Sequence, residues 1–156
     1  TISIILNEFK RLNPTFDFDI LGTDISANVL EKASRGVYPM DKVNIVPLEI
    51  KKKYFLKSKN RQTPTVRVKP ILQQNLKLSY LNLMDSVYDV KDSFDLIFCR
   101  NVLIYFDRET QVKVITKLIR HLKPGGYFFI GHSESLSGMD LPLEHIKPTI
   151  FRKINS

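Results

Sequence analysis

The sequence predicts an α/β domain with a mostly parallel sheet, and two observations support this prediction. Short apolar segments typical of buried strands alternate along the chain with longer segments whose apolar residues recur at helical spacing. Polar residues follow the ends of these strand-like segments, where folds of this class place their ligands.

The first part of the chain contains a helix, a strand and a second helix. Residues 2–12 carry apolar side chains at helical spacing, and residues 18–23 form a short strand that closes on Asp24. A hydroxyl at the start of the segment 26–35 can cap a second helix. Gly36 follows this helix and is expected to end it.

The middle of the chain has a different character. Residues 48–56 fit a short helix, and residues 57–64 form a polar connector. Alternating apolar and polar residues at 65–69 and at 76–78 predict short strands.

The last part returns to alternating strands and helices. Residues 94–100 predict a buried strand and residues 108–122 a helix. A sharp turn at 123–126 leads to a second buried strand at 127–130, and residues 144–152 predict a terminal hairpin.

Composition excludes several classes of protein. The chain has 156 residues, of which 43% are apolar, which is enough for a real core and argues against disorder. It contains no run of 18 apolar residues and does not open like a signal peptide, so we expect no membrane insertion. One cysteine, Cys99, rules out a disulfide framework and suits a reducing, cytoplasmic compartment.

The net charge of +8 is concentrated in one segment. Residues 42–79 contain ten basic residues and one acid, a net charge of +9, whereas the rest of the chain carries −1. Uniform basicity would indicate a nucleic-acid partner, but a local patch indicates one acidic protein face. The segment also lacks the regular aromatic residues of a nucleic-acid surface, so we expect no nucleic acid.

Asp24 and the pair Asn82 and Leu83 are the first candidate site residues. A carboxylate at the end of a strand accepts hydrogen bonds from ribose hydroxyls in nucleoside-binding folds, although Asp24 could equally belong to a helix cap. The amide or backbone at Asn82 and Leu83 could bind an adenine edge. A plain turn is the alternative there.

The segment 98–106 contains the largest cluster of candidate site residues in the sequence. Arg100 and Asn101 stand between two apolar runs, and polar groups are costly to bury without partners. A ligand would explain them, as would an internal salt bridge and an amide that fixes a loop. Tyr105 follows and could serve the same site or the core.

The neighbours His132 and Ser133, followed by Glu134, invite comparison with a hydrolase. The nucleophile elbow requires G-x-S-x-G, and this segment lacks the final glycine. We therefore expect a structural loop. The three histidines show no metal-ligand spacing, so we expect no metal.

Four motifs occur together in the chain. They are GTDIS at 22–26, CRNVLIYF at 99–106, LKPGG at 122–126 and GHSE at 131–134. Together they resemble the CheR-type chemotaxis receptor methyltransferases. The resemblance implies a Rossmann-like class I fold, S-adenosylmethionine (SAM) as cofactor with S-adenosylhomocysteine (SAH) as product, and methylation of glutamate side chains on bacterial chemoreceptors.

The same resemblance implies a role for each matched residue. Asp24 would hold the ribose, and Asn82 and Leu83 the adenine end; Cys99, Arg100 and Asn101 would lie near the amino-acid part of the cofactor, and Tyr105 near the transferred methyl group. Tyr105 and Arg100 would be the catalytic pair. Residues 54–79 would form a small inserted antiparallel β-subdomain that contacts the methyl-accepting chemotaxis receptor, in some members by strand addition.

Two features of the family are not found in this sequence. The N-terminal helical domain and the strand with its glycine-rich cofactor loop, which in the family precede the helix at 2–12, are absent. We therefore expect residues 1–156 to form a partial methyltransferase domain with weak or no activity alone. The flanks of two strands should then be exposed and could self-associate. The alternative function is a non-catalytic SAM or SAH sensor, or a protein-docking module.

Overall fold

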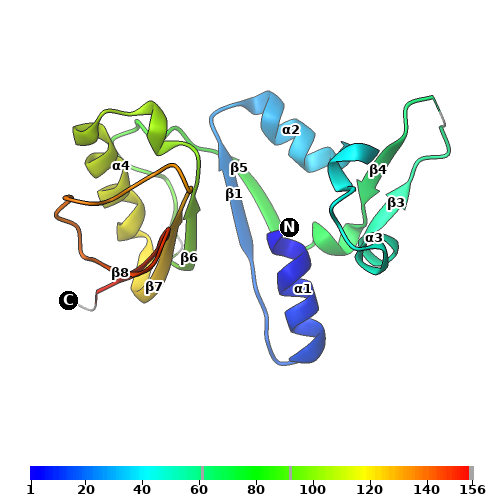
Figure 1. Ribbon diagram of the computed structural model, residues 1–156, viewed down its shortest axis with the longest axis horizontal. Coiled ribbons are helices and arrows are strands. Elements are labelled where there is room, and N and C mark those ends of the chain that lie inside the picture. The colour runs from blue at the N-terminus through cyan, green and yellow to red at the C-terminus, as the bar shows by residue number, and fades with distance from the viewer. Residues whose placement is uncertain (61, 92, 155–156) are drawn as a thin grey trace. The chain divides into compact units, whose positions relative to one another are not determined.

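The computed structural model describes residues 1–60, 62–91 and 93–154 (Figure 1). The chain forms two compact units, Thr1–Asn82 and Leu83–Ser156. Helices and strands alternate in both units, which confirms the expected α/β class.

The first unit is built on a parallel pair of strands and two helices. β1 (Ile20–Asp24) pairs with β5 (Leu76–Tyr80), and α1 (Ile2–Leu12) and α2 (Ala27–Arg35) fall in the predicted segments. The Ser26 hydroxyl accepts a hydrogen bond from the third residue of α2, as expected of a cap. Gly36 ends the helix in the left-handed region, at a φ of 60°.

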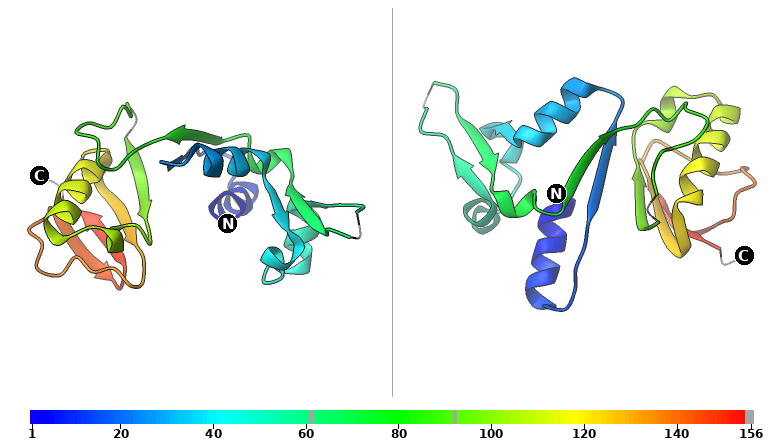
Figure 2. Two further views of the ribbon diagram at one scale, coloured as in Figure 1. Left: turned by 90° about the horizontal axis from the view of Figure 1, so that it is seen from above. Right: turned by 180° about the vertical axis from the view of Figure 1, so that it is seen from behind.

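A small antiparallel sheet completes the first unit. Its order is β2 (Val37–Pro39), β4 (Thr65–Val68) and β3 (Phe55–Lys57). The connecting helices are η1 (Met40–Val43), α3 (Leu48–Tyr54) and η2 (Pro70–Leu72). Figures 1 and 2 show the β3–β4 hairpin at a distance from the β1–β5 pair of the same unit.

The bounds of this sheet correct the expectation of a subdomain at 54–79. The sheet gains β2, which precedes that segment, and it does not contain β5, which pairs in parallel with β1. The alternation at 76–78 correctly predicted a strand there. Alternation reports which faces of a strand are apolar and does not report which strand it pairs with.

The second unit is a four-stranded sheet with one long helix. Its order is β6 (Phe94–Cys99), β7 (Leu122–Ile130), β9 (Ile150–Lys153) and β8 (Leu143–Lys147). β6 and β7 are parallel, whereas β7–β9 and β8–β9 are antiparallel. This sheet therefore has fewer parallel strand pairs than the predicted mostly parallel sheet. Between β6 and β7 lie η3 (Leu103–Tyr105) and α4 (Arg108–Arg120).

Two boundaries in this unit differ from the prediction. The turn expected at 123–126 lies inside β7, because Leu122 already pairs with Phe94. The register then shifts between Phe94 and Leu96, which accommodates the glycines. For the same reason α4 ends at Arg120 instead of continuing to 122.

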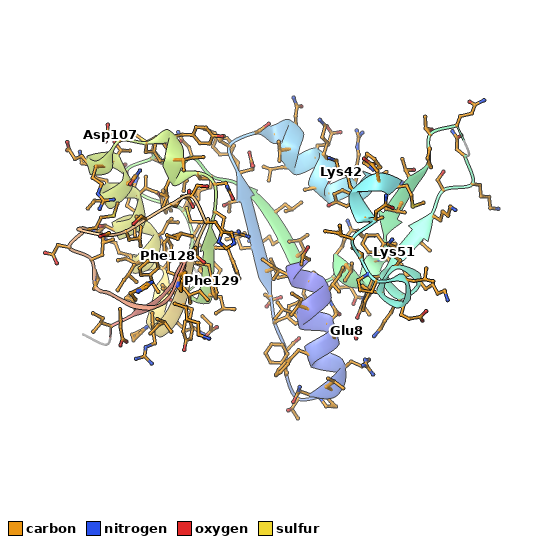
Figure 3. The ribbon with its side chains drawn as sticks, in the orientation of Figure 1. Glu8, Lys42, Lys51, Asp107, Phe128 and Phe129 are labelled. Carbon is orange, nitrogen blue, oxygen red and sulfur yellow. The ribbon has the colours of Figure 1, made fainter. Side chains whose placement is uncertain are left out.

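The main hydrophobic core belongs to the second unit. It is formed by one face of the β6–β7 pair and one face of α4, and its members are Cys99, Leu103, Val114, Ile115, Ile119, Leu122, Phe128, Ile130 and Leu136. In contrast, α1 and α2 contain no buried residue. α1 is tied to α3 through Glu8, labelled in Figure 3, which accepts hydrogen bonds from Lys53 and the Tyr54 hydroxyl. These bonds, that from Lys53 first, lower the pKa of Glu8.

β1 and β6 each have a neighbouring strand on one side only among the described residues. β1 pairs with β5, and β6 with β7. On β6, Leu96 and Phe98 are each 44% exposed. Such strands present unpaired N–H and C=O groups and can accept a further strand. None of the helices in the described part of the chain is long and apolar enough to cross a membrane.

Candidate functional site

Asp24 is the last residue of β1 and shapes the turn that enters α2. Its Oδ1 accepts a hydrogen bond from the backbone N–H of Ser26 at 2.8 Å. The cap of the helix is therefore Ser26, and Asp24 supports it. The side chain of Asp24 is half-buried.

Asn82 and Leu83 follow β5, and the loop that begins there is fixed from two sides. Both side chains are half-buried. The Leu83 carbonyl accepts hydrogen bonds from the Tyr88 hydroxyl at 2.9 Å and from Lys117 Nζ at 2.8 Å. Lys117 also donates to the Asp85 carbonyl, and its ammonium group lies 4.9 Å from the centre of the Tyr88 ring. Burial raises the pKa of Tyr88 to about 12, so the phenol is protonated and donates at neutral pH.

Sequence reasoning missed Lys117 and Tyr88 as supports of this loop. Lys117 lies on α4, far along the chain from Leu83, and nothing in the spacing of the helix sets it apart from Lys113, the other lysine of the helix. Only the packing of α4 against the loop brings the ammonium group to the two carbonyls. The backbone at Leu83 is therefore held by tertiary contacts that no local pattern predicts.

Cys99 ends β6 and lies in the hydrophobic core. Its thiol is buried among apolar side chains, and burial raises its pKa to about 12, with the nearby charge of Glu134 as the second cause. The thiol is thus protonated and faces the core at neutral pH. Any contact between Cys99 and a ligand would be made by its backbone.

Arg100, Asn101 and Tyr105 form an exposed corner between β6 and α4. All three side chains are exposed, and Tyr105 is 80% exposed. The expectation that Arg100 and Asn101 are buried between the two apolar runs is therefore wrong, and neither residue needs a ligand or an internal partner to offset a cost of burial. Asn101 does adopt the left-handed region at a φ of 60°, which is unusual for a residue other than glycine.

Glu134 holds this corner from the loop that follows β7, and sequence reasoning missed it. Its Oε2 accepts from the backbone N–H groups of Gly131 at 2.5 Å and Asn101 at 3.1 Å, and its Oε1 from those of Val102 at 2.9 Å and Leu103 at 2.8 Å. The prediction of a structural loop at His132 and Ser133 agrees with their exposed side chains. A possible signal was an acid placed three residues after a glycine that directly follows a buried strand.

Each unit, taken by itself, has polar groups at the end of a strand, Asp24 as the last residue of β1 and Arg100 after β6. A carboxylate at the end of a strand suits a pair of ribose hydroxyls, and an exposed guanidinium suits a carboxylate. In the corner after β6, the Tyr105 hydroxyl adds a hydrogen-bond donor, and the Asn101 side chain adds an amide. Polar groups at strand ends in an α/β fold are typical of nucleotide-binding domains, a class that includes the SAM-dependent methyltransferases.

Comparison with known proteins identifies the family. The family described as "CheR methyltransferase, SAM binding domain" matches residues 1–152. The chain belongs to this family, and its cofactor is SAM.

Three curated relatives have the name chemotaxis protein methyltransferase. The protein from Borreliella burgdorferi is 40% identical over 154 residues, which cover 98% of this chain and 53% of the relative. The proteins from Escherichia coli and Salmonella typhimurium are 38% and 37% identical over 122 and 120 residues, covering 78% and 77% of this chain and 42% of each relative. The chain thus spans about half the length of the curated relatives it matches.

Proposed function

We propose that the intact protein transfers a methyl group from SAM to glutamate side chains of bacterial chemoreceptors, in the cytoplasm. The family match over residues 1–152 is the observation that carries this proposal. The relatives named chemotaxis protein methyltransferase support the biological setting. The polar groups at the ends of β1 and β6 supply the chemistry that the cofactor requires.

We assign the cofactor contacts residue by residue. Asp24 accepts from the ribose hydroxyls, and Asn82 and Leu83 bind the adenine edge. Arg100 pairs with the cofactor carboxylate, and the backbones of Cys99 and Asn101 lie beside the amino-acid part. The exposed guanidinium of Arg100 and the half-buried carboxylate of Asp24 at the end of β1 support these assignments.

The acceptor glutamate needs no general base. Its reference pKa is about 4.3, so it is ionised at neutral pH and its oxygen is already nucleophilic. When bound, SAM supplies an electrophilic methyl group on a sulfonium. Tyr105 donates a hydrogen bond from its hydroxyl to the acceptor carboxylate and orients it, and its exposure leaves it open to a protein substrate. Alignment and exclusion of water should dominate the rate.

Asp24→Asn is expected to weaken SAH binding about tenfold, because the neutral amide accepts less strongly from the ribose hydroxyls. The amide oxygen can still accept from the Ser26 N–H, so the turn into α2 should be kept. Isothermal titration of SAH into the wild type and the variant measures the change. Asp19→Asn is the matched control, since Asp19 is exposed and precedes the same strand.

The outcomes of this titration separate the assignments. An unchanged SAH affinity in Asp24→Asn would remove the ribose role of Asp24. A wild-type protein that does not bind SAH would contradict the cofactor assignment as a whole. Binding of SAH without any methyl transfer to receptor would favour a non-catalytic sensor or docking module.

We further propose that the antiparallel sheet of the first unit contacts the receptor through its basic residues. Lys42 and Lys51, labelled in Figure 3, lie in this part of the chain. Most basic residues of the segment form no ion pair with a described acid, whereas Lys52 pairs with Glu49 and Lys53 with Glu8; Arg61 lies outside the described residues. Basic side chains that form no ion pair with a described acid can attract and orient an acidic partner. The single-sided strands β1 and β6 could also pair with a second copy.

Reversing three of these charges is expected to lower kcat/KM for receptor methylation about tenfold at low salt, and less at high salt. The variant combines Lys57→Glu, Lys59→Glu and Arg67→Glu, all on the β3–β4 hairpin. Its control combines Lys91→Glu, Arg120→Glu and Lys147→Glu, which make the same change on exposed residues of the second unit. Equal losses in both triple variants would contradict a specific contact. SAH affinity should be unchanged in both.

A further inference from the structure

Glu134 is the one buried charged side chain among the residues that the structure describes, with 8% of its surface exposed. A buried carboxylate is costly unless it is fully hydrogen-bonded. Its four backbone donors meet this requirement, two on each oxygen. The site is a nest of N–H groups that the protein fills with its own anion.

The carboxylate is ionised at neutral pH. Burial is the largest single influence and would raise the pKa of Glu134, but the four backbone N–H groups together outweigh it and hold the pKa below the ordinary value. The neighbouring titratable group is the Cys99 thiol, which stays protonated. The charge at this position therefore belongs to Glu134. Its stabilisation is complete above the ordinary pKa of a glutamate and is lost as the pH falls through the lowered native value.

The three donors from Asn101 to Leu103 are consecutive and form the turn from β6 into η3. Asn101 is held there in the left-handed region, at a φ of 60°, which asparagine tolerates better than most residues with a side chain. The side chains of Arg100, Asn101 and Tyr105 are exposed, so packing does not orient them. Their directions are set by the backbone, and Glu134 is the group that holds this backbone.

We propose that Glu134 is a positioning residue: it holds the backbone of residues 101–103, and through this segment it positions Asn101 and the neighbouring side chains of Arg100 and Tyr105. It touches neither cofactor nor substrate. The link to methyl transfer rests on the proposed function, whereas the hold on the corner does not. Glu134 therefore acts on the reaction through the corner, from the loop after the neighbouring strand β7.

Two substitutions separate the charge of Glu134 from its shape. Glu134→Gln keeps the shape but removes the charge, and its amide nitrogen cannot accept the N–H groups on that side. Glu134→Asp keeps the charge but is one methylene shorter. We expect amide hydrogen exchange at residues 101–103 to accelerate at least tenfold in Glu134→Gln, and less in Glu134→Asp. SAH affinity should fall in the same order, at least tenfold in Glu134→Gln.

Glu109→Gln is the matched control, because Glu109 is exposed in the first turn of α4 and pairs only with Lys113 among the described residues. It should change neither exchange at the corner nor SAH binding. Exchange in the middle of α4 reports global stability in every variant. Acceleration in α4 equal to that at 101–103 would mean a purely structural role and would overturn the proposal.

Two further outcomes are decisive. Unchanged exchange at 101–103 in Glu134→Gln would overturn the proposal. If wild-type protein does not bind SAH, the proposed function fails, but the exchange data still decide whether Glu134 holds the corner. If Glu134→Gln does not fold, an acid titration of the wild type replaces it. The amides of Gly131 and 101–103 should then shift together, with a midpoint below the reference value of about 4.3, and a midpoint at or above that value would overturn the proposal.

Discussion

Phe128→Ala is expected to lower the free energy of unfolding of the second unit by about 3–5 kcal/mol, the range for truncating a fully buried phenylalanine. Phe128 is 0% exposed and lies on β7 between Ile97 of β6 and Phe151 of β9. Its ring faces the core that α4 completes. The cavity left by the ring would be closed on both sides by paired strands, so little relaxation could fill it.

Phe129→Ala is the matched control on the same strand, and both residues are labelled in Figure 3. Successive residues of a strand face opposite sides of the sheet. Phe129 is half-buried and stacks on the exposed ring of Phe98, at 4.4 Å between ring centres. Its loss should cost about 1–2 kcal/mol, since less apolar surface leaves contact.

Hydrogen exchange in α4 and β7 measures both variants without requiring a single transition for the whole chain. Protection there should fall far more in Phe128→Ala than in Phe129→Ala. Equal losses would show that the second unit is stabilised from both faces of its sheet, contrary to the core described above. Exchange in α2, in the first unit, serves as the internal reference.

Local signals predicted the elements of the fold well. The helical spacing at 2–12, the cap at Ser26 and the glycine after α2 each correspond to an observed feature, because each depends on neighbours in the sequence. Strand partners were less predictable. β5 carries the alternation of an exposed strand, yet it pairs in parallel with β1, which lies more than 50 residues earlier. Pairing between distant segments depends on tertiary packing that the alternation does not encode.

The candidate site shows the same division. The end of β1 at Asp24 was correctly predicted, whereas β6 ends at Cys99, one residue before the predicted end, and is less buried than predicted. The roles of Glu134, which holds the turn after β6, and of Lys117, which holds the loop after β5, were not predicted. Both act on backbone atoms of distant residues, and backbone N–H and C=O groups are the same in every sequence. The pattern of side chains in the sequence therefore does not indicate which backbone groups a distant side chain will hydrogen-bond.

Gly131→Ala is expected to cost the second unit about 3 kcal/mol, between the cost of overpacking and that of breaking a buried charge from its partners. A Cβ atom at this position would lie 2.7 Å from Glu134 Oε2 and 3.0 Å from the Asn101 backbone nitrogen. The obstacle is the carboxylate and the backbone, neither of which can move without breaking hydrogen bonds. The methyl group would thus displace Glu134 from its four donors.

Gly138→Ala is the control that isolates backbone strain from this displacement. Gly138 has a φ of +72°, so alanine there is strained by about 1 kcal/mol. The nearest atom to its Cβ would be Arg108 Nη2 at 3.7 Å, an ordinary contact. Exchange at 101–103 should therefore accelerate strongly in Gly131→Ala and stay unchanged in Gly138→Ala. If exchange at 101–103 is also unchanged in Gly131→Ala, the carboxylate is not what excludes a side chain at position 131.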